Sequence, residues 1–277
     1  MAIHPSAIIA PSSFVAPGAR IADGVTIGPF CTVGADVSLA AGVELISHVV
    51  IDGHTEIGEG VRVYPFASIG LAPQDLKYKG EPTRCVVGAR TLVREAATIH
   101  RGSAGVTTVG PDCMIMATVH VGHDCTLGHH VILANDVILG GHVRIDDMVF
   151  VGGGTAVHQF VHIGRYSVIG GMTGVEADVI PYGAAMGNRA RHIGLNLGGL
   201  KRRGFSRPQI HALRAMFRLL FRETGVFADR VALAAERFAG DAQVEEVLAF
   251  IAAPSRRGLC KAGRDPVGEG EDEAAGG

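Results

Sequence analysis

Histidine is concentrated in one short stretch of the chain, TVHVGHDCTLGHHVILANDVILGGHV, which covers residues 118–143. The stretch holds five of the chain's 13 histidines, at positions 120, 123, 129, 130 and 142. An imidazole with a pKa of about 6.5 can accept a proton from a reacting group at neutral pH, and it can also bind a metal ion. Which chemistry is open to the stretch depends on which rings share one face of the fold.

The elements that must position these rings repeat every six residues. Eleven consecutive hexads run from residue 3 to residue 68, and twelve more begin at residue 109. In the first block each hexad starts with Ile, Val or Leu, and its fifth residue is small or β-branched. This period fits neither an α-helix nor an alternating hairpin. It is typical of a parallel β-solenoid in which three hexads form one triangular coil of about 18 residues, with coils about 4.8 Å apart.

The hexads are interrupted by LAPQDLKYKGEPTR at residues 71–84 and by GVTT at 105–108. They stop after Pro181, and a helical pattern begins at Ser206, a suitable N-cap that is followed by Pro208 in the first turn. Two further short helices are expected around residues 227–238 and 241–252.

The predicted fold class is therefore an all-β solenoid of hexapeptide repeats followed by a small α-helical domain. We expect the solenoid domain over residues 1–185, with the loop excursion at 71–84, and the C-terminal helical domain over 186–262. Residues 263–277 are polar and rich in glycine, so a disordered tail is expected there.

Composition favours an ordered chain, because hydrophobic residues make up 47% of the 277 and charged residues only 19%. A net charge of −2 provides no overall attraction to nucleic acid or anionic lipid. The sequence predicts neither a signal peptide nor a membrane-spanning segment. The five cysteines lack a CxxC motif, which favours a reducing, cytoplasmic location. Cys31, Cys113 and Cys125 occupy the inward fifth position of their hexads, so we expect small core residues rather than nucleophiles.

Counting the faces in threes from the hexad at residue 87 places four histidines in one column outside the core: His100, His123, His142 and His158. This count requires that the GVTT insert leaves the face order unchanged. His120 lies at the corner leading into the column, and His123, Gly141 and Gln159 lie in register because they are 18 residues apart. Such a gathering of imidazoles favours a functional site over a polar surface ladder.

Two neighbouring groups are interpreted from the same count. His129 and His130 belong to the next face, where we expect them to be solvated. If the excursion at 71–84 replaces a single hexad, it leaves from the histidine face, and Asp75, Lys77 and Lys79 would overhang the column or reach a neighbouring subunit.

Five segments resemble, in order, the UDP-N-acetylglucosamine acyltransferase family, which catalyses the first step of lipid A synthesis in Gram-negative bacteria: QDLKYKGEPTR, TIHRG, HVGHDCTLGHHVILAND, GGTAVHQF and GLKRRGFSR. Hexads alone would indicate only the wider superfamily of hexapeptide-repeat acyltransferases. The resemblance implies a left-handed β-helix, whereas the general rule for parallel crossovers predicts a right-handed one. It also implies a homotrimer with active sites between adjacent subunits.

The resemblance implies a reaction and a site as well. An (R)-3-hydroxyacyl chain would move from acyl carrier protein to the 3-position of UDP-N-acetylglucosamine, with no cofactor and no metal. By matching position His123 would be the general base, Asp124 would orient or polarise it, and Gly141 would offer its backbone N–H to the oxyanion. The positions implied to bind sugar, diphosphate or acyl groups, together with His100 from the same column, are Asp75, Lys77, His100, His120, His142, His158 and Gln159.

Further positions concern the ends of the two substrates. Asn196, Arg202 and Arg203 would bind the uridine diphosphate end. Gly171 matches the position that gauges acyl length, and a glycine there leaves room for a long chain. Gly198 stands where relatives commonly carry an acidic residue.

The implied chemistry suits the residue types. A sugar hydroxyl is a poor nucleophile at neutral pH, so its attack on a thioester needs a base such as neutral histidine. Gly141 lies one coil from His123, about 4.8 Å away, which is a suitable place for an oxyanion donor. Neighbouring side chains on a strand diverge, so a hydrogen bond between His123 and Asp124 requires a corner in the chain there. The alternative is that Asp124 serves only as a turn residue.

Several alternatives stay open. His120, His123 and His142 could bind zinc across a subunit interface, as in trimeric carbonic anhydrase-like proteins, although hydration chemistry needs neither the helices nor the QDLKY loop. A non-catalytic scaffold would not need the polar column, and the N-acyltransferase of the same pathway would carry an extra N-terminal domain. The acceptor could also be a 3-amino sugar. Arg214, Arg218 and Arg222 recur every four residues and either dock the acidic acyl carrier protein or form a solvated helix face.

Overall fold

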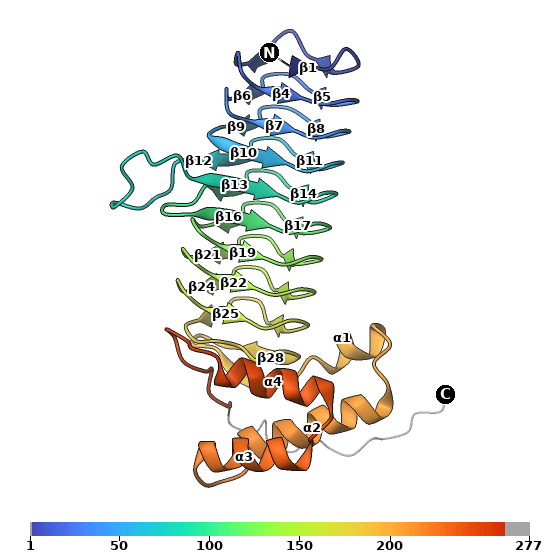
Figure 1. The fold of residues 1–277 in the computed structure, drawn as a ribbon, viewed down its shortest axis with the longest axis vertical. Helices are drawn as coiled ribbons and strands as arrows, with labels where there is room; N and C mark the ends of the chain where they lie inside the picture. The colour runs from blue at the N-terminus through green and yellow to red at the C-terminus, as the bar shows by residue number, and fades with distance from the viewer. Residues whose placement is uncertain (1, 264–277) are drawn as a thin grey trace.

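Short strands build a triangular rod in the computed structural model, which describes residues 2–263. Figure 1 shows the coils stacked along the long axis, with the N-terminus at one end and the helices at the other. The predicted fold class, a parallel β-solenoid followed by a few helices, is confirmed. The disorder expected for the tail at 263–277 falls outside the described residues, apart from Gly263.

Each face of the rod is one sheet, and the strands of each sheet follow one another from coil to coil. The first sheet contains β1 (Ala2–Ile3), β4 (Arg20–Ile21), β7 (Ser38–Leu39), β10 (His54–Ile57), β13 (Arg84–Val87), β16 (Val106–Val109), β19 (Thr126–Leu127), β22 (Arg144–Ile145) and β25 (His162–Ile163). The second contains β2 (Ile8–Ile9), β5 (Thr26–Ile27), β8 (Glu44–Leu45), β11 (Arg62–Val63), β14 (Leu92–Val93), β17 (Met114–Ile115), β20 (Ile132–Leu133), β23 (Phe150–Val151), β26 (Val168–Ile169), β28 (Gly183–Met186) and β29 (Arg191–Leu195). The third contains β3 (Phe14–Val15), β6 (Thr32–Val33), β9 (Val50–Ile51), β12 (Ser68–Leu71), β15 (Thr98–His100), β18 (His120–Val121), β21 (Ile138–Leu139), β24 (Ala156–Val157) and β27 (Gly174–Val175).

The inward residues of the hexads form one continuous core. Along the third sheet, Val121 pairs with Leu139 and Leu139 with Val157, and each is at most 3% exposed. The prediction for the three cysteines is confirmed, because Cys31, Cys113 and Cys125 are buried and unpaired. Burial raises the pKa of the Cys125 thiol to about 12, which keeps it protonated and unreactive at neutral pH.

Both interruptions leave the register of the third sheet intact. Residues 72–83 project from the rod between β12 and β13, on the histidine face as predicted (Figure 1). The GVTT insert forms most of β16, which pairs with β13 in the first sheet. Thr98 consequently pairs with His120 across the insert, which confirms that the face order is unchanged.

In the described part of the chain four helices follow the solenoid: α1 (Leu197–Arg202), α2 (Arg207–Phe221), α3 (Phe227–Arg237) and α4 (Ala242–Ala252). Ser206 caps α2 in a capping box, as the sequence predicts, and α3 and α4 confirm the two further short helices. The sequence pattern did not predict α1, which begins after the N-cap Asn196. Apolar helix residues pack on Ile180 and Tyr182 and so cover the end of the rod (Figure 1). Within residues 2–263 none of the helices has the length and apolar character needed to cross a bilayer.

His192 is a fully buried imidazole where β29 meets the C-terminal segment. Its Nδ1 donates to the carbonyl of Cys260 at 2.8 Å, and its Nε2 accepts from the N–H of Ile180 at 3.2 Å. Burial lowers the pKa of His192 to about 4, whereas the unfolded chain titrates at about 6.5. Between these pH values only the unfolded chain binds the proton, so the free energy of unfolding falls as the pH drops through this window.

The expected size of this effect is on the order of 2 kcal/mol between pH 7 and pH 5. The free energy of unfolding is measured with denaturant at both pH values. Between pH 7 and pH 5 it should fall by this much more in the wild type than in His192→Gln, whose side chain does not titrate. Equal losses in both proteins would mean that His192 takes up its proton without unfolding.

Candidate active site

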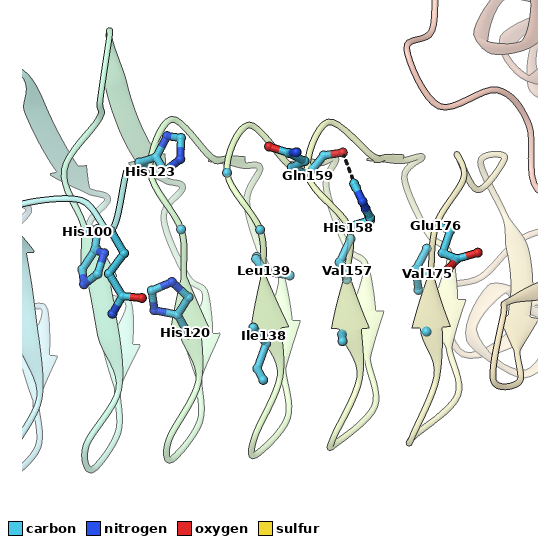
Figure 2. Close-up of a pocket in the computed structure, with 16 residues that line it drawn as sticks. His100, His120, His123, Ile138, Leu139, Val157, His158, Gln159, Val175 and Glu176 are labelled. Atoms are coloured by element: carbon cyan, nitrogen blue, oxygen red, sulfur yellow. Dashed lines mark hydrogen bonds between the residues drawn. The ribbon is translucent and has the colours of Figure 1, made fainter. Parts of the chain in front are cut away.

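The predicted histidine column lies along a cleft of about 580 Å³ on the third sheet. Figure 2 shows that His100, His120, His123 and His158 border the same cleft, although His120 and His123 share one coil and the coil with Ile138 lies before that of His158. The register predicted for Gly141 is also seen, because the carbonyl of His123 accepts from the N–H of His142 and that of Gly141 from the N–H of Phe160. The repeat therefore brings together residues that are far apart in the sequence.

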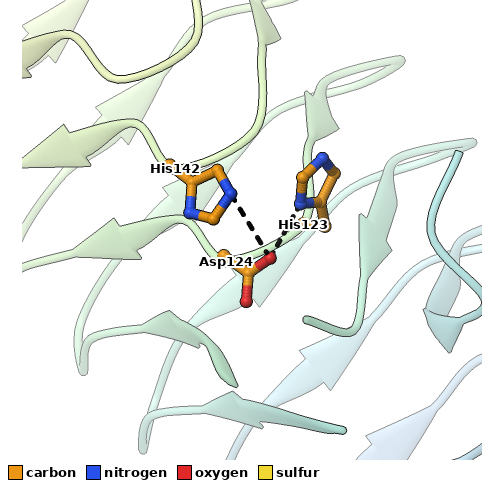
Figure 3. A group of neighbouring side chains, drawn as sticks. All are labelled: His123, Asp124 and His142. Atoms are coloured by element: carbon orange, nitrogen blue, oxygen red, sulfur yellow. Dashed lines mark hydrogen bonds and ion pairs between the residues drawn. The ribbon is translucent and has the colours of Figure 1, made fainter. Parts of the chain in front are cut away.

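His123 and Asp124 form a hydrogen-bonded pair at the corner between the third and first sheets. Nδ1 of His123 lies 2.8 Å from Oδ2 of Asp124 (Figure 3). The backbone of Asp124 has a φ of +58°, which turns the chain sharply and lets two adjacent side chains meet. The corner that this contact requires is thus present, and Asp124 is more than a turn residue.

The Asp124 carboxylate is held from several sides. The backbone N–H groups of Ser103 and Gly105 donate to it at 2.9 and 2.8 Å. Burial by itself would raise the pKa of Asp124, but the hydrogen bonds from His123, Ser103 and Gly105 lower it below its usual value. An ionised carboxylate can only accept hydrogen bonds, so Nδ1 of His123 carries the hydrogen and donates it to Asp124. In this tautomer of the ring Nε2 carries no hydrogen and is free to accept one.

Nε2 of His123 lies directly beside Gly141. A Cβ atom added at Gly141 would be only 2.4 Å from this nitrogen, so no side chain fits between the ring and the backbone. Among the backbone hydrogen bonds of the described residues, none uses the N–H of Gly141. A potential base and a potential oxyanion donor are therefore neighbours in the cleft.

Burial favours the neutral form of two further rings in the cleft, His100 and His120. Burial, reinforced by the neighbouring His120, lowers the pKa of His100 to about 4, and burial also lowers the pKa of His120. These two rings meet edge to face at 4.9 Å, and Nδ1 of His120 lies 2.7 Å from Oγ1 of Thr98. Neutral imidazoles in the cleft can donate and accept hydrogen bonds to a polar ligand without repelling one another.

His142 lies beside the pair rather than in the lining of the cleft. Its Nε2 is 3.8 Å from Oδ2 of Asp124 (Figure 3). Its ring stacks on Phe160 with 4.6 Å between the ring centres. Burial lowers the pKa of His142 in spite of the nearby Asp124 charge. Ligand atoms of His123, Asp124 and His142 lie within 4.8 Å of one another, a spacing that could also hold a metal ion.

The loop at 72–83 reaches the site through Asp75, whose Oδ2 accepts from Oγ of Ser103 at 2.5 Å. Hydrogen bonds from Ser103 and from the N–H of Lys77 lower the pKa of Asp75. His158 stands on the rim, where its Nδ1 donates to the carbonyl of Gln159 at 3.2 Å (Figure 2). For Lys77, only the backbone bond to Asp75 is seen among the described residues.

Sequence reasoning missed several residues of the cleft. Gln74 and Glu176 line it beside the predicted positions. Glu176 could have been found from the register, because Val157 pairs with Val175 and the next residues are His158 and Glu176. Ser103 gave no such signal, because it is the fifth residue of the hexad at 99–104, a position where the repeat predicts a small inward residue.

Four predicted residues lie away from this cleft within the chain. Gly171 follows β26 at the corner between the second and third sheets. Asn196 caps α1 and donates to the carbonyl of Tyr166 at 2.8 Å, so both ends of its amide have partners. Arg203 lies over the Tyr166 ring and contacts Met148 at the corner between the first and second sheets. Arg202 is exposed at the end of α1.

Comparison with known proteins identifies the family of this chain. Residues 178–260 match the family described as UDP-N-acetylglucosamine O-acyltransferase, domain 2, and residues 107–141 match the bacterial transferase hexapeptide repeats. An acyl-[acyl-carrier-protein]--UDP-N-acetylglucosamine O-acyltransferase of Caulobacter vibrioides is 52% identical over 77% of this chain and 82% of its own length. This chain belongs to the UDP-N-acetylglucosamine O-acyltransferase family.

Solved structures of the family agree with this assignment. The UDP-N-acetylglucosamine acyltransferase of Bacteroides fragilis superposes with a TM-score of 0.89 at 32% identity, covering 92% of this chain and all of that one. The Moraxella catarrhalis UDP-N-acetylglucosamine O-acyltransferase gives 0.82 at 39% identity, covering 94% and 100%. The family resemblance found from the sequence motifs is thereby confirmed.

Proposed function

We propose that this chain transfers an acyl group from acyl carrier protein to UDP-N-acetylglucosamine, the activity that the names of its relatives describe, in the lipid A pathway. The finer proposal is that an (R)-3-hydroxyacyl chain is joined to the sugar 3-hydroxyl, or to the 3-amino group of an analogue. The observation that carries the proposal is Nε2 of His123, which faces Gly141 while Asp124 holds the opposite nitrogen. The unpaired thiols are compatible with a cytoplasmic location.

The proposed mechanism uses residues of this chain alone. Nε2 of His123 removes the proton of the sugar hydroxyl as its oxygen attacks the thioester carbonyl. The N–H of Gly141 stabilises the negative charge on the resulting tetrahedral oxygen. When the C–S bond breaks, the departing thiolate takes the proton back from His123, and the ester and free acyl carrier thiol are released. Asp124 stabilises the imidazolium that exists between these steps.

The remaining polar residues are proposed to bind substrate. Asp75, Lys77, His100, His120, His142, His158 and Gln159 would hold the sugar, the diphosphate or the acyl head. The neutral rings of His100 and His120 suit sugar hydroxyls, because they supply both donors and acceptors at neutral pH.

The uridine diphosphate and acyl-chain residues are proposed to act from a neighbouring subunit. Gly171 lies at another corner of the rod than His123, Asn196 and Arg203 contact residues of a third corner, and Arg202 lies at the end of α1. A second copy placed beside the third sheet could bring its own corner residues to the His123 cleft. We therefore propose a homotrimer whose sites lie between subunits.

The outer faces of the rod support this assembly. Outward residues of the second sheet form an apolar ladder in register, Leu92, Met114, Ile132, Phe150 and Val168. On the third sheet Ile138 is 52% exposed, whereas the first sheet presents charged residues such as Arg84 and Arg144. A ring of three copies, each with its second sheet against the next copy's third sheet, would cover the apolar ladder and Ile138.

Sedimentation velocity tests this assembly. Phe150→Asp and Ile138→Asp should each shift the protein from trimer to monomer and abolish activity, because a charge would be buried in the contact. Thr126→Asp, on the outer side of the first sheet, is the matched control and should remain trimeric. If the wild type sediments as a monomer at the assay concentration, the proposal that the active site lies between subunits is wrong.

The basic surface of α2 is a candidate contact for acyl carrier protein. Arg214 and Arg218 are exposed, whereas Arg222 donates to the carbonyls of Gly263 and Ile193. Arg214→Glu/Arg218→Glu should raise the KM for the acyl carrier substrate about tenfold and flatten its salt dependence, because attraction becomes repulsion. The KM for the sugar nucleotide should not change. Arg20→Glu in the first coils serves as the control, and equal kinetics in both variants would exclude this docking surface.

Product analysis by mass spectrometry tests the function itself. The protein is incubated with UDP-N-acetylglucosamine or its 3-amino analogue and with a panel of acyl carrier thioesters. An ester or amide product of the expected mass supports the proposal, and the panel identifies the preferred acyl length. Absence of any acylated sugar nucleotide would refute it.

A metal-dependent hydration activity is the second candidate, because His123, Asp124 and His142 could hold an ion. Asp124 Oδ2 already accepts hydrogen bonds from His123 and Ser103, which favours the metal-free interpretation. Chelation with EDTA should leave acyl transfer unchanged. Zinc-dependent hydration activity in a protein that shows no acyl transfer would support the second candidate instead.

A further inference from the structure

Ser103 contacts two carboxylates that come from different parts of the chain. Its Oγ donates to Oδ2 of Asp75 in the projecting loop at 2.5 Å. Its backbone N–H donates to Oδ2 of Asp124 in the catalytic corner at 2.9 Å. Ser103 itself is only 9% exposed. One buried residue therefore links the loop to the proposed catalytic pair.

The segment around Ser103 is anchored on both sides. On the catalytic side, the N–H of Gly105 donates to Asp124 at 2.8 Å, and Oγ1 of Thr107 accepts from the N–H of Asp124 at 2.8 Å. On the loop side, Arg101 donates to the hydroxyl of Tyr78 at 3.0 Å and to the carbonyl of Gly70 at 2.8 Å. The end of the hexad at 99–104 and the GVTT insert that follows it thus connect two functional segments.

The two bonds of Ser103 have separable effects. Asp75 and Asp124 carry like charges, so their approach is stabilised only by donors placed between them. The N–H of Ser103 belongs to the backbone and is present whatever the side chain. Its hydroxyl, in contrast, is the only side-chain donor to Asp75 seen among the described residues. A change of side chain at this position alters the loop contact and leaves the Asp124 contact in place.

We propose that Ser103 is a positioning residue that fixes Asp75 of the projecting loop relative to the His123–Asp124 pair. This rests on the proposed function, in which Asp75 binds the sugar nucleotide. Through Asp75, the hydroxyl of Ser103 determines where the acceptor sugar binds. Its backbone N–H holds the Asp124 carboxylate that orients His123. Sugar binding and base orientation are thereby built on one short segment.

Steady-state kinetics of Ser103→Ala and Ser103→Thr test the proposal. Ser103→Ala should raise the KM for the sugar nucleotide about tenfold, the usual effect of losing a hydrogen bond to a charged group. Its kcat should change by less than about threefold, because the bonds to Asp124 remain. Ser103→Thr keeps the hydroxyl and should restore the KM, which a purely structural role would not require. An unchanged KM, or a fall in kcat alone, would overturn the proposal.

A double-mutant cycle with Asp75→Ala sharpens the test. If Ser103 acts through Asp75, Ser103→Ala should raise the KM no further in the Asp75→Ala background. A full additional tenfold rise there would show that Ser103 acts elsewhere and would overturn the proposal. These failures differ from failure of the proposed function, which would appear as a wild-type protein with no acyl transfer.

Discussion

Replacing His123 by alanine should lower turnover by about 10²–10⁴-fold, the usual contribution of a general base. The ring is the group beside Gly141 whose Nε2 is left unprotonated by the bond from Nδ1 to Asp124. Its side chain lies outside the core of the rod, in a corner, and is 16% exposed. The substitution should therefore leave the fold and the subunit contacts intact. Single-turnover kinetics with the acyl carrier thioester measure the chemical step directly.

A matched variant separates loss of the base from a general effect of removing histidine. His54 lies in β10 of the first sheet, is solvent-exposed and is 3.9 Å from Asp36. His54→Ala should keep the wild-type turnover within about twofold, since no substrate contact is proposed there. If His123→Ala is as active as His54→Ala, another group removes the proton and His123 is not the base.

The histidine column was predictable because the solenoid has a strict period. Once three hexads form a coil, residues of one face recur about every 18 positions, and core packing fixes which side chain points inward. The pairing of Thr98 with His120 shows that even the GVTT insert does not disturb this count. Position along the repeat was therefore enough to group His100, His123 and His158 without knowledge of the structure.

The contacts that orient the column were not predictable in the same way. Ser103 is the fifth residue of the hexad at 99–104, where the repeat predicts an inward residue, and Gly105 begins the insert. Neither N–H group could therefore be assigned to Asp124 from register. The corner at Asp124 needs a φ of +58°, which the residue type permits but does not dictate. Asn196 shows a further limit, since a residue implied to bind nucleotide also caps α1, a helix that the sequence pattern did not predict.

Sequence periodicity cannot predict which residues another chain contributes to a site, and the reason is geometric. Counting hexads assigns a residue to a face of its own rod, but it says nothing about which face of a second rod approaches. Gly171 and Arg203 lie on corners other than that of His123, and only an assembly can bring such corners together. Resemblance to a family could suggest this grouping, whereas register alone could not.

Gly141→Ala should lower turnover by about 10²-fold or more, although it adds a single methyl group. The added Cβ would lie 2.4 Å from Nε2 and 2.5 Å from Cε1 of His123, well inside contact distance. The ring must move by about 1 Å to relieve this contact, and a displacement of that size commonly costs about 10²-fold in rate. Gly194→Ala is the matched control, because a Cβ there meets no atom within 4 Å, and it should have wild-type turnover.

The same variant distinguishes the two roles proposed around Gly141. Alanine keeps the backbone N–H, so the oxyanion donor survives and the loss should act through the displaced His123 ring. In the His123→Ala background the ring is absent, and Gly141→Ala should then lower the residual turnover by less than about threefold. If the full 10²-fold loss persists in the double variant, the methyl group instead blocks the oxyanion site or the substrate. The contact between Gly141 and the imidazole would then have no part in holding the base.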